Sequence, residues 1–537
     1  YYLFVVETFK DVRMVGAPPS SIGKFGGESD NWMWPRHNAD FSVFRIYANK
    51  DNKPAEYSKD NVPYKPKNVI PISLKGYKQG DFTMVYGFPG RTQEYLSSYA
   101  VDMIMNESDP LKVSLREKRL NIMNVDMLQS DAVRIAYASK YQGIANYYKK
   151  WMGEMNGLKK YDAVAKKQLF ENQFNEAISA NAAQKEKYGN IFPQLQKVYA
   201  EYKILNKQVD YYSECLMAID ALNYARFYIT LNNELKKKQK GASNTYDKTL
   251  EEYKKLGFFK NYNKPTDIKI CEAMLAEYVK GVPSNSRPYV LDSFIVANNN
   301  DAKKMTDFLF SNTNFVDKEK AEVMLNDYDK YTNLYERDPI FYITSSIVKY
   351  YNTSVFPQFQ YDEREINELQ KLYIQGQKEI FKDKKFYPDA NSTLRVAYGK
   401  VNNYIPKDGV EYNYYTTLDG IMEKYIPKDE EFDVPAKLKE LYEKKDYGQY
   451  ANKDGKLQVA FTASNHTTGG NSGSPVFNAK GQLIGTNFDR NWEGTMSDIM
   501  YNPNQCRNIT LDVRYTLFII DKFAGAGYLL SEMKLVK

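Results

Sequence analysis

The sequence is poor in the residues that build disulfide frameworks, metal centres and membrane spans. It has only three cysteines, Cys215, Cys271 and Cys506, which are too few and too scattered for a disulfide framework or a zinc site. No run of about 18 apolar residues occurs, so we expect no segment to span a membrane. No cofactor is expected, and cysteine usage leaves the redox compartment open.

The sequence also lacks a large excess of either basic or acidic residues. The 537 residues include 74 Lys and Arg against 67 Asp and Glu, a net charge of +7, and no basic tract stands out. Nucleic acid binding is therefore not indicated. Tyrosine, by contrast, is abundant at 47 residues, which is typical of a large, partly buried amphipathic surface. The length is sufficient for two or more domains.

The chain begins without an initiator methionine or a signal peptide. The segment from Tyr1 to Val6 resembles the middle of a secondary-structure element. We therefore expect a fragment whose natural N-terminus is missing, and the lack of a targeting segment has no meaning here.

Hydrophobic periodicity divides the chain into three parts. Residues 1–92 have short apolar runs separated by Gly- and Pro-rich turns, which predicts strands. Residues 93–386 have helical spacing, with the longest periodic run at about 193–238, and predict an all-α domain. Residues 387–537 return to strand patterns around a polar, helical insertion at 417–446. The predicted class is α+β, with strands at both ends enclosing a large helical insertion that would cap a cleft.

The most informative stretch runs from Thr467 to Phe477. Apolar runs at Leu457 to Thr462 and Leu483 to Gly485 flank it, so the pattern predicts a strand, a Gly-rich loop and two further strands. Ser472 lies between glycines on this loop, where its hydroxyl would be exposed. The amides of Gly470 and Ser472 can point at one spot, as an oxyanion hole requires.

An ordinary hairpin loop is the alternative interpretation, since Gly, Ser and Asn are common turn formers. The sequence Gly-Asn-Ser-Gly-Ser-Pro between strands nevertheless favours a chymotrypsin-like serine peptidase.

A serine nucleophile needs a base, and the base needs an orienting carboxylate. The only histidines are His37 and His466, and neither has the spacing of a chymotrypsin-type site. Asp40, which precedes an apolar strand, is the carboxylate candidate, although a plain strand-entry residue is the alternative. If Asp40 orients the base, we expect that base upstream of Tyr1.

Several motifs together closely resemble the bacterial dipeptidyl-peptidase 7 and 11 family of serine exopeptidases. The resemblance covers essentially the whole chain and is closest to the Asp/Glu-specific dipeptidyl-peptidases 11. The motifs are Val15 to Gly27, Asp30 to His37, Gly87 to Thr92, Ala145 to Tyr147 and Gly469 to Pro475.

The resemblance implies a fold and a catalytic set. The fold is a chymotrypsin-like double β-barrel, N-terminally truncated here, with an inserted α-helical cap. Ser472 would be the nucleophile, Asp40 the residue that orients the histidine, and Gly470 an oxyanion amide. The Asn-His-His-Cys segment that carries the family's base is absent from this sequence. We therefore expect this chain to contain only part of the family's catalytic residues.

The resemblance also implies residues that hold the substrate's free amine. Asn31, Trp32 and Asn146 match the positions at which the family binds the substrate N-terminus. Such a group needs acceptors and a block against longer peptides. Taken singly, each residue has a structural alternative, a capping Asn or a core Trp.

Selectivity is expected to come from Arg490, eighteen residues after Ser472. A guanidinium in the pocket would pair with a substrate carboxylate and disfavour apolar side chains. By resemblance, Arg here marks Asp/Glu specificity and Gly marks a hydrophobic preference. The alternative is a salt bridge to Asp489, Glu493 or Asp498, and Asp489 is a weaker candidate for organising the amine or the arginine.

The sequence thus predicts a serine dipeptidyl-peptidase that removes Xaa-Asp and Xaa-Glu through an acyl-enzyme. Its partners would be peptides with a free N-terminus. The alternatives are a dipeptidyl-peptidase 7-like enzyme with hydrophobic preference, an endopeptidase, and a non-catalytic peptide-binding homologue. A homodimer and a periplasmic or cell-surface location are expectations from the resemblance alone.

Overall fold

The computed structural model describes residues 3, 5–242 and 245–537. Part of the segment expected to lie within a secondary-structure element, namely Tyr1, Tyr2 and Phe4, is therefore outside the described residues. Leu3, Val5 and Val6 are exposed and belong to no helix or strand.

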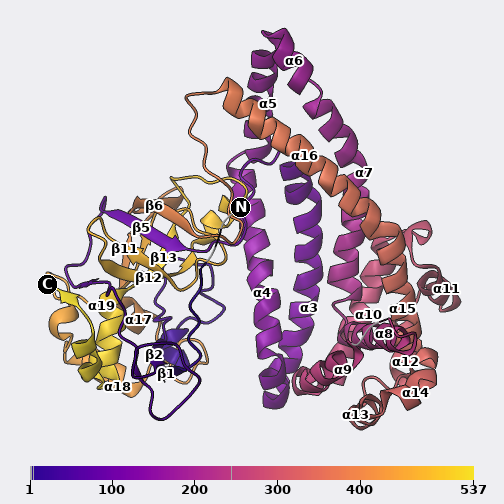
Figure 1. The fold of residues 1–537 in the computed structure, drawn as a ribbon, viewed down its shortest axis with the longest axis horizontal. Coiled ribbons are helices and arrows are strands. Elements are labelled where there is room, and N and C mark those ends of the chain that lie inside the picture. Colours follow the sequence, from indigo (N-terminus) through magenta and orange to yellow (C-terminus); the bar gives the residue numbers. More distant parts are fainter. Residues whose placement is uncertain (1–2, 4, 243–244) are drawn as a thin grey trace. The chain divides into compact units, whose positions relative to one another are not determined.

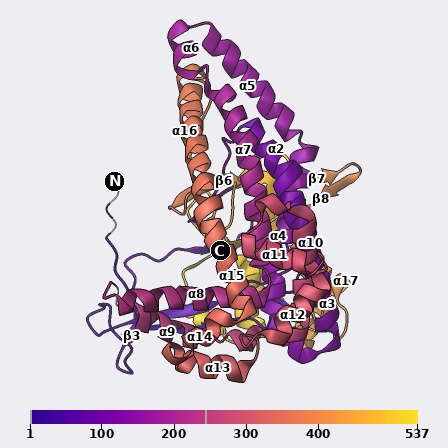
Figure 2. The same cartoon turned by 90° about the vertical axis from the view of Figure 1, so that its right-hand side faces the viewer.

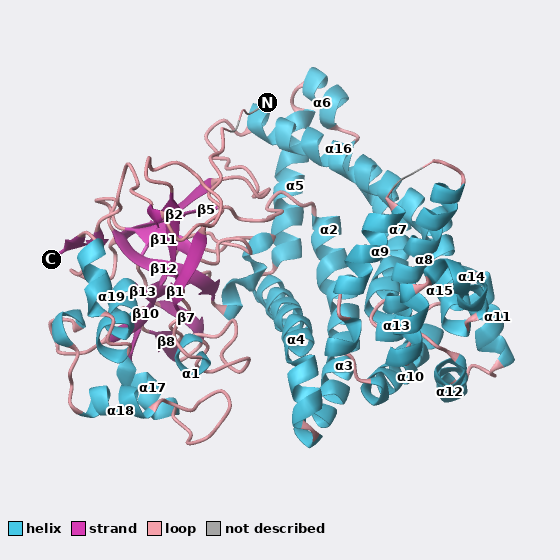
Figure 3. Cartoon of the chain, turned by 60° about the horizontal axis from the view of Figure 1, so that its bottom comes forward, coloured by secondary structure: helices cyan, strands magenta, loops and turns pink. Residues whose placement is uncertain are grey.

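The chain divides into two compact units (Figure 1). One combines Tyr1–Glu94 with Tyr387–Lys537, and the other is Tyr95–Phe386. Colouring by secondary structure shows that the strands gather in the first unit, whereas the second is built from helices (Figure 3).

The first unit contains the strands and a few short helices. Its strands are β1 (Val12–Gly16), β2 (Val43–Ala48), β3 (Val62–Pro63), β4 (Ile72–Ser73), β5 (Phe82–Gly87), β6 (Arg395–Lys400), β7 (Tyr404–Lys407), β8 (Val410–Tyr412), β9 (Tyr415–Thr417), β10 (Gln458–Ala463), β11 (Ser474–Phe477), β12 (Leu483–Arg490), β13 (Asn508–Asp512) and β14 (Leu535–Val536). Its α-helices are α1 (Ser20–Gly23), α17 (Leu418–Lys424), α18 (Ala436–Glu443) and α19 (Val513–Phe518).

Six of these strands form a closed ring. The antiparallel order is β6-β5-β11-β12-β13-β10. A bridge between Val401 and Ala463 joins the two ends, and the N–H of Ser464 donates to the carbonyl of Lys400 at 2.9 Å. The ring encloses a small buried cluster of Tyr77, Val85, Val401, Phe461, Val476 and Ile484. The bridge joins β6 and β10 at one end, so the six strands close into a ring there.

The remaining strands form smaller assemblies. β1, β2 and β3 make a separate three-stranded antiparallel sheet, and β7 pairs with β8. The predicted α+β class is confirmed, whereas a second barrel beside the closed ring stays a prediction.

The second unit is helical in every described element. Its α-helices are α2 (Ser98–Met103), α3 (Asp109–Gln129), α4 (Asp131–Lys160), α5 (Ala163–Ser179), α6 (Ala182–Tyr188), α7 (Ile191–Tyr211), α8 (Asp220–Gln239), α9 (Tyr246–Lys255), α10 (Lys264–Gly281), α11 (Tyr289–Ala297), α12 (Ala302–Asn312), α13 (Lys318–Asn326), α14 (Tyr328–Arg337), α15 (Pro339–Tyr350) and α16 (Phe356–Ile380).

Two long pairs organise this unit. α3 and α4 form a hairpin in which Ser130 caps α4, its hydroxyl accepting from the N–H of Val133 at 3.4 Å. α16 runs along α7, as Figures 1 and 2 both show, and the rings of Tyr202 and Phe359 stack between them with centroids 4.8 Å apart. Within the described ranges, no helix combines the length and apolar composition needed to cross a bilayer.

The periodic run at about 193–238 is two helices rather than one. α7 continues as a π-helical turn at Tyr212–Leu216, and Met217–Ile219 separates it from α8. The break has a tertiary cause, because buried Asp267 accepts from the first two amides of α8, those of Asp220 at 2.8 Å and Ala221 at 3.0 Å. Periodicity alone does not register such a cap from another helix.

Candidate active site

Ser472 lies on an exposed loop between β10 and β11. Its hydroxyl donates to the carbonyl of Phe488 at 3.3 Å, and the N–H of Gly473 donates to the carbonyl of Asn487 at 2.8 Å. Both partners belong to β12, whose Asn487 is paired with Ser474 of β11. The loop is therefore held on the strand that ends in Arg490.

The glycine at position 470 is required by close packing. Gly470 has φ +100°, and a Cβ there would lie 2.4 Å from the carbonyl oxygen of Phe88 and 3.0 Å from the amide nitrogen of Gly90. Gly90 also donates to the carbonyl of Gly469 at 2.6 Å. The Gly87 to Thr92 motif thus supports the serine loop from behind.

Two amides of the loop make no internal hydrogen bond. Across the described part of the chain, neither the N–H of Gly470 nor that of Ser472 donates to any protein group. The side chain of Asn471 holds the loop between them, its oxygen accepting from the N–H of Thr468 at 3.1 Å and its carbonyl accepting from Asn487 at 3.0 Å. The sequence reasoning missed Asn471 and Asn487, because turn asparagines carry no distinguishing signal.

Asp40 is exposed just before β2 and makes no hydrogen bond or ion pair to any described residue. The surrounding protein still desolvates its carboxyl enough to raise the pKa above its ordinary value. The charge of Arg36 opposes this rise and that of Asp489 adds to it. Asp40 therefore lies in the field of these two residues, and the structure shows no hydrogen bond between Asp40 and Ser472.

Neither histidine contacts Ser472 in the residues that the structure describes. His37 is buried against Gly420, and burial, with Lys424 and Arg36, lowers its pKa to about 3. His466 stacks on Tyr501 with centroids 4.6 Å apart, and its Nε2 donates to the carbonyl of Ser497 at 2.7 Å. Burial lowers the pKa of His466 as well. Both are neutral structural side chains here.

Asp489 accepts three hydrogen bonds through its carboxylate. One oxygen accepts from the guanidinium of Arg36 at 2.7 Å and from the N–H of Trp32 at 3.2 Å. The other accepts from the N–H of Arg490 at 2.8 Å. Arg36 also donates to the side chain of Asn38 at 2.7 Å. Asp489 thereby joins the Trp32 and Arg36 segment to the end of β12.

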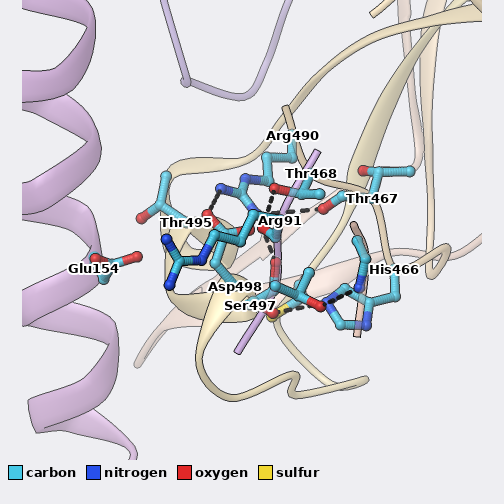
Figure 4. A network of polar contacts seen from close by, with 12 residues as sticks. Arg91, Glu154, His466, Thr467, Thr468, Arg490, Thr495, Ser497 and Asp498 are labelled. Carbon is cyan, nitrogen blue, oxygen red and sulfur yellow. Dashed lines mark hydrogen bonds and ion pairs between the residues drawn. The ribbon is translucent and has the colours of Figure 1, made fainter. Parts of the chain in front are cut away.

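The guanidinium of Arg490 is buried and paired with Asp498 (Figure 4). Its two terminal nitrogens lie 2.6 Å and 2.8 Å from the two carboxylate oxygens of Asp498. Nη1 also donates to the hydroxyl of Ser497 at 2.8 Å and to the carbonyl of Thr467 at 3.2 Å. Of the three salt-bridge alternatives considered for Arg490, the structure has the one with Asp498.

The other predicted substrate residues lie in both units. Asn31 donates to Glu28 at 3.1 Å, and the ring of Trp32 lies 5.4 Å from the guanidinium carbon of Arg490. Trp32 adopts φ +65°, a conformation that few non-glycine residues adopt. Asn146 is half-buried on α4 of the helical unit. That Asn146 binds the substrate N-terminus together with Asn31 and Trp32 stays a prediction.

Comparison with known proteins identifies the family. The Peptidase S46 family model matches residues 1–535, and the chain belongs to this family of peptidases. An Asp/Glu-specific dipeptidyl-peptidase of Flavobacterium psychrophilum is 47% identical over 100% of this chain and 74% of its own. Dipeptidyl-peptidase 7 of Porphyromonas gingivalis is 39% identical, again over 100% of this chain and 74% of its own.

A solved structure has the same fold. The crystal structure of Porphyromonas endodontalis DPP11 in complex with the dipeptide Arg-Glu matches with a TM-score of 0.85 at 36% identity, covering 98% of this chain and 75% of that one. The family resemblance stated from the sequence motifs is therefore confirmed.

Proposed function

We propose that this protein is a serine dipeptidyl-peptidase that removes Xaa-Asp and Xaa-Glu from the N-terminus of peptides. The observation that carries the proposal is the placement of a buried arginine, Arg490, two residues beyond the strand carbonyl that accepts from Ser472. The loop of the nucleophile candidate is thus hydrogen-bonded to the strand that carries the cationic specificity group.

The loop of Ser472 supports an acyl-enzyme mechanism. Ser472 would attack the substrate carbonyl, and the amides of Gly470 and Ser472 would donate to the oxyanion that develops. These two N–H groups make no bond to any other described residue, so they need not break one to bind the oxyanion. Losing one such donor typically costs about 10² to 10³ in rate.

Asp40 is proposed to orient the histidine that accepts the proton of Ser472. Burial and the charge of Asp489 raise the pKa of Asp40, and the nearby cation Arg36 opposes that rise. The support for the role is therefore the family resemblance together with the position of Asp40 beside Arg36. Neither His37 nor His466 is proposed as that base, because His37 is buried against Gly420 and the half-buried His466 donates to the carbonyl of Ser497.

Acidic selectivity is proposed to come from Arg490. A buried guanidinium favours a side chain that can supply a carboxylate and disfavours an apolar one. The 47% identical relative is named for Asp/Glu specificity, which supports the assignment. The pairing of Arg490 with Asp498, however, neutralises part of this charge, and it favours a second candidate, an enzyme with a hydrophobic preference like dipeptidyl-peptidase 7.

Exopeptidase action is proposed to depend on Asn31, Trp32, Asn146 and Asp489 at the substrate's free amine. The carboxylate of Asp489 supplies negative charge beside the backbone of Trp32, which is the chemistry that an ammonium group requires. A homodimer in the periplasm or at the cell surface completes the proposal, supported by the family resemblance.

The test compares release of a fluorophore from free-amine dipeptides ending in Asp, Glu and Leu by the full-length gene product and its Arg490→Gly variant. Fast cleavage after Asp or Glu that the variant loses supports both the reaction and the pocket. Preference for Leu in the unaltered enzyme would favour the second candidate.

N-acetylated dipeptides are the control for exopeptidase action, because acetylation removes the charge that the amine site would bind. An unchanged rate on the acetylated substrates would contradict a dipeptidyl-peptidase and indicate an endopeptidase. No cleavage of any substrate, with Ser472 unreactive to a serine-directed phosphonate, would indicate a non-catalytic peptide-binding protein.

A further inference from the structure

Asp498 compensates the charge of Arg490 inside the candidate specificity site. The ion pair is bidentate, and the two side chains are only 6% and 16% exposed. Two parallel N–H···O bonds at this depth are stronger than a single surface contact. The charges of the guanidinium and its carboxylate therefore offset each other within the candidate specificity site.

One terminal nitrogen of Arg490, Nη1, already has more acceptors than hydrogens. Nη1 has two hydrogens and three acceptors, namely Thr467, Ser497 and Asp498. A substrate carboxylate that approaches this nitrogen must share or displace one of them. It also meets the negative charge of Asp498, which repels it.

The backbone at Asp498 has contacts that do not involve Arg490. Its carbonyl accepts from the N–H of Gln93 at 2.6 Å, and the neighbouring carbonyl of Ser497 accepts from His466 at 2.7 Å. The 3-10 helix Trp492–Asp498 ends at this residue. These backbone contacts hold the segment in place, so the carboxylate can be neutralised by substitution without removing its support.

We propose that Asp498 is a specificity-setting residue that weakens the preference of the site for an acidic substrate side chain. This inference rests on the proposed function of Arg490. With Asp498 ionised, Arg490 already pairs with a carboxylate, so replacing that partner with the carboxylate of a substrate adds little binding free energy. With Asp498 neutral, the buried arginine lacks full compensation, and an acidic side chain supplies it.

Asp498→Asn tests the proposal, because asparagine keeps the shape and one acceptor while removing the charge. The measurement is kcat/KM on dipeptide substrates that differ only in Glu against Gln at the second residue, since this pair differs by charge at nearly constant volume. We expect the Glu/Gln ratio of kcat/KM to rise about tenfold in the variant, as expected for a unit charge removed near a partly buried pair.

Glu493→Gln is the matched control. Glu493 lies on the same 3-10 helix and accepts from Tyr404 at 3.2 Å and from Asn491 at 3.1 Å. Its substitution removes the same charge without touching Arg490, so we expect its Glu/Gln ratio to stay within about twofold of the unaltered enzyme. Asp498→Ser, assayed in parallel, keeps the test available if the asparagine variant does not fold.

The results of the Asp498 and Glu493 variants distinguish the proposal from its alternatives. A rise in the Glu/Gln ratio in the Asp498 variant, absent in Glu493→Gln, supports the proposal. An equal loss on both substrates assigns Asp498 a purely structural role, and a fall in the ratio makes it a residue that orients Arg490 for acidic substrates. Either result overturns the proposal. If neither the unaltered enzyme nor the Asp498 variant discriminates Glu from Gln, the proposed function of Arg490 fails instead.

Discussion

Arg36 and Asp489 form a buried ion pair across 453 residues of sequence, with 2.7 Å between Nη1 and the carboxylate. Their side chains are 6% and 11% exposed. The pair joins the segment that carries Trp32 to the strand that carries Arg490. It therefore aligns two groups of candidate substrate residues that are remote in sequence.

Replacing Arg36 with methionine is expected to destabilise the strand-rich unit strongly. Removing one partner of a buried pair leaves the other charge uncompensated, which typically costs about 3–5 kcal/mol. Thermal or denaturant unfolding measures the effect. The control is Arg45→Met, because Arg45 pairs with Glu532 at the surface and such a pair contributes about 0–1 kcal/mol. Equal losses in the two variants would contradict the assigned importance of the Arg36 pair.

Gly470→Ala is expected to reduce kcat by at least about 10², because moving the loop displaces an oxyanion donor. The new Cβ would lie 2.4 Å from the carbonyl oxygen of Phe88, at a φ of +100°. Gly469→Ala is the matched control, since a Cβ there meets nothing within 4 Å. The two variants should differ in steady-state kinetics on a free-amine dipeptide. Comparable activity in both would remove the Gly470 amide from the proposed oxyanion site.

Ser472→Ala is expected to abolish covalent labelling by a serine-directed phosphonate and to leave stability nearly unchanged. The hydroxyl is exposed and makes a single 3.3 Å hydrogen bond, so its loss costs about 1 kcal/mol or less. Mass spectrometry of the intact protein detects the label. Ser474→Ala, which alters the buried serine two residues on, should still be labelled. Labelling that survives in Ser472→Ala would place the nucleophile elsewhere.

Stability is expected to fall as the pH is lowered from about 6.5 towards 3, in part because of His37. Burial lowers the pKa of His37 to about 3 in the folded protein, whereas the unfolded chain takes up a proton near pH 6.5. Between these values the unfolded state binds more protons, so acid favours unfolding.

Comparing unfolding of the unaltered protein and His37→Gln at pH 7 and pH 4 isolates this contribution. The unaltered protein should lose up to about 3 kcal/mol more than the variant over that interval. Parallel losses would show that His37 is not held neutral. His466, whose pKa burial also lowers, contributes in the same direction to both proteins.

Several features were predictable from the sequence because their causes are local. The glycines around Ser472 predict a tight loop, and the structure has positive φ at Gly470 and Gly473. Helical periodicity over 93–386 predicts the helices that the second unit contains. The motifs that resemble the dipeptidyl-peptidases are confirmed as membership of Peptidase S46.

Two features of the fold depend on contacts between segments that are distant in sequence, so only the tertiary structure reveals them. Periodicity near 193–238 does not reveal the break before α8, because Asp267 of another helix caps it. Neither does local pattern reveal that β6 and β10 close a ring through Val401 and Ala463.

The sequence by itself determined the family, the helical and strand-rich segments, and the candidate nucleophile. These follow from backbone preferences and motifs that act over a few residues. Which carboxylate Arg490 pairs with was left open among Asp489, Glu493 and Asp498, and the fold selected Asp498. Local sequence cannot make that choice, because it depends on where the 3-10 helix after β12 brings each carboxylate in space.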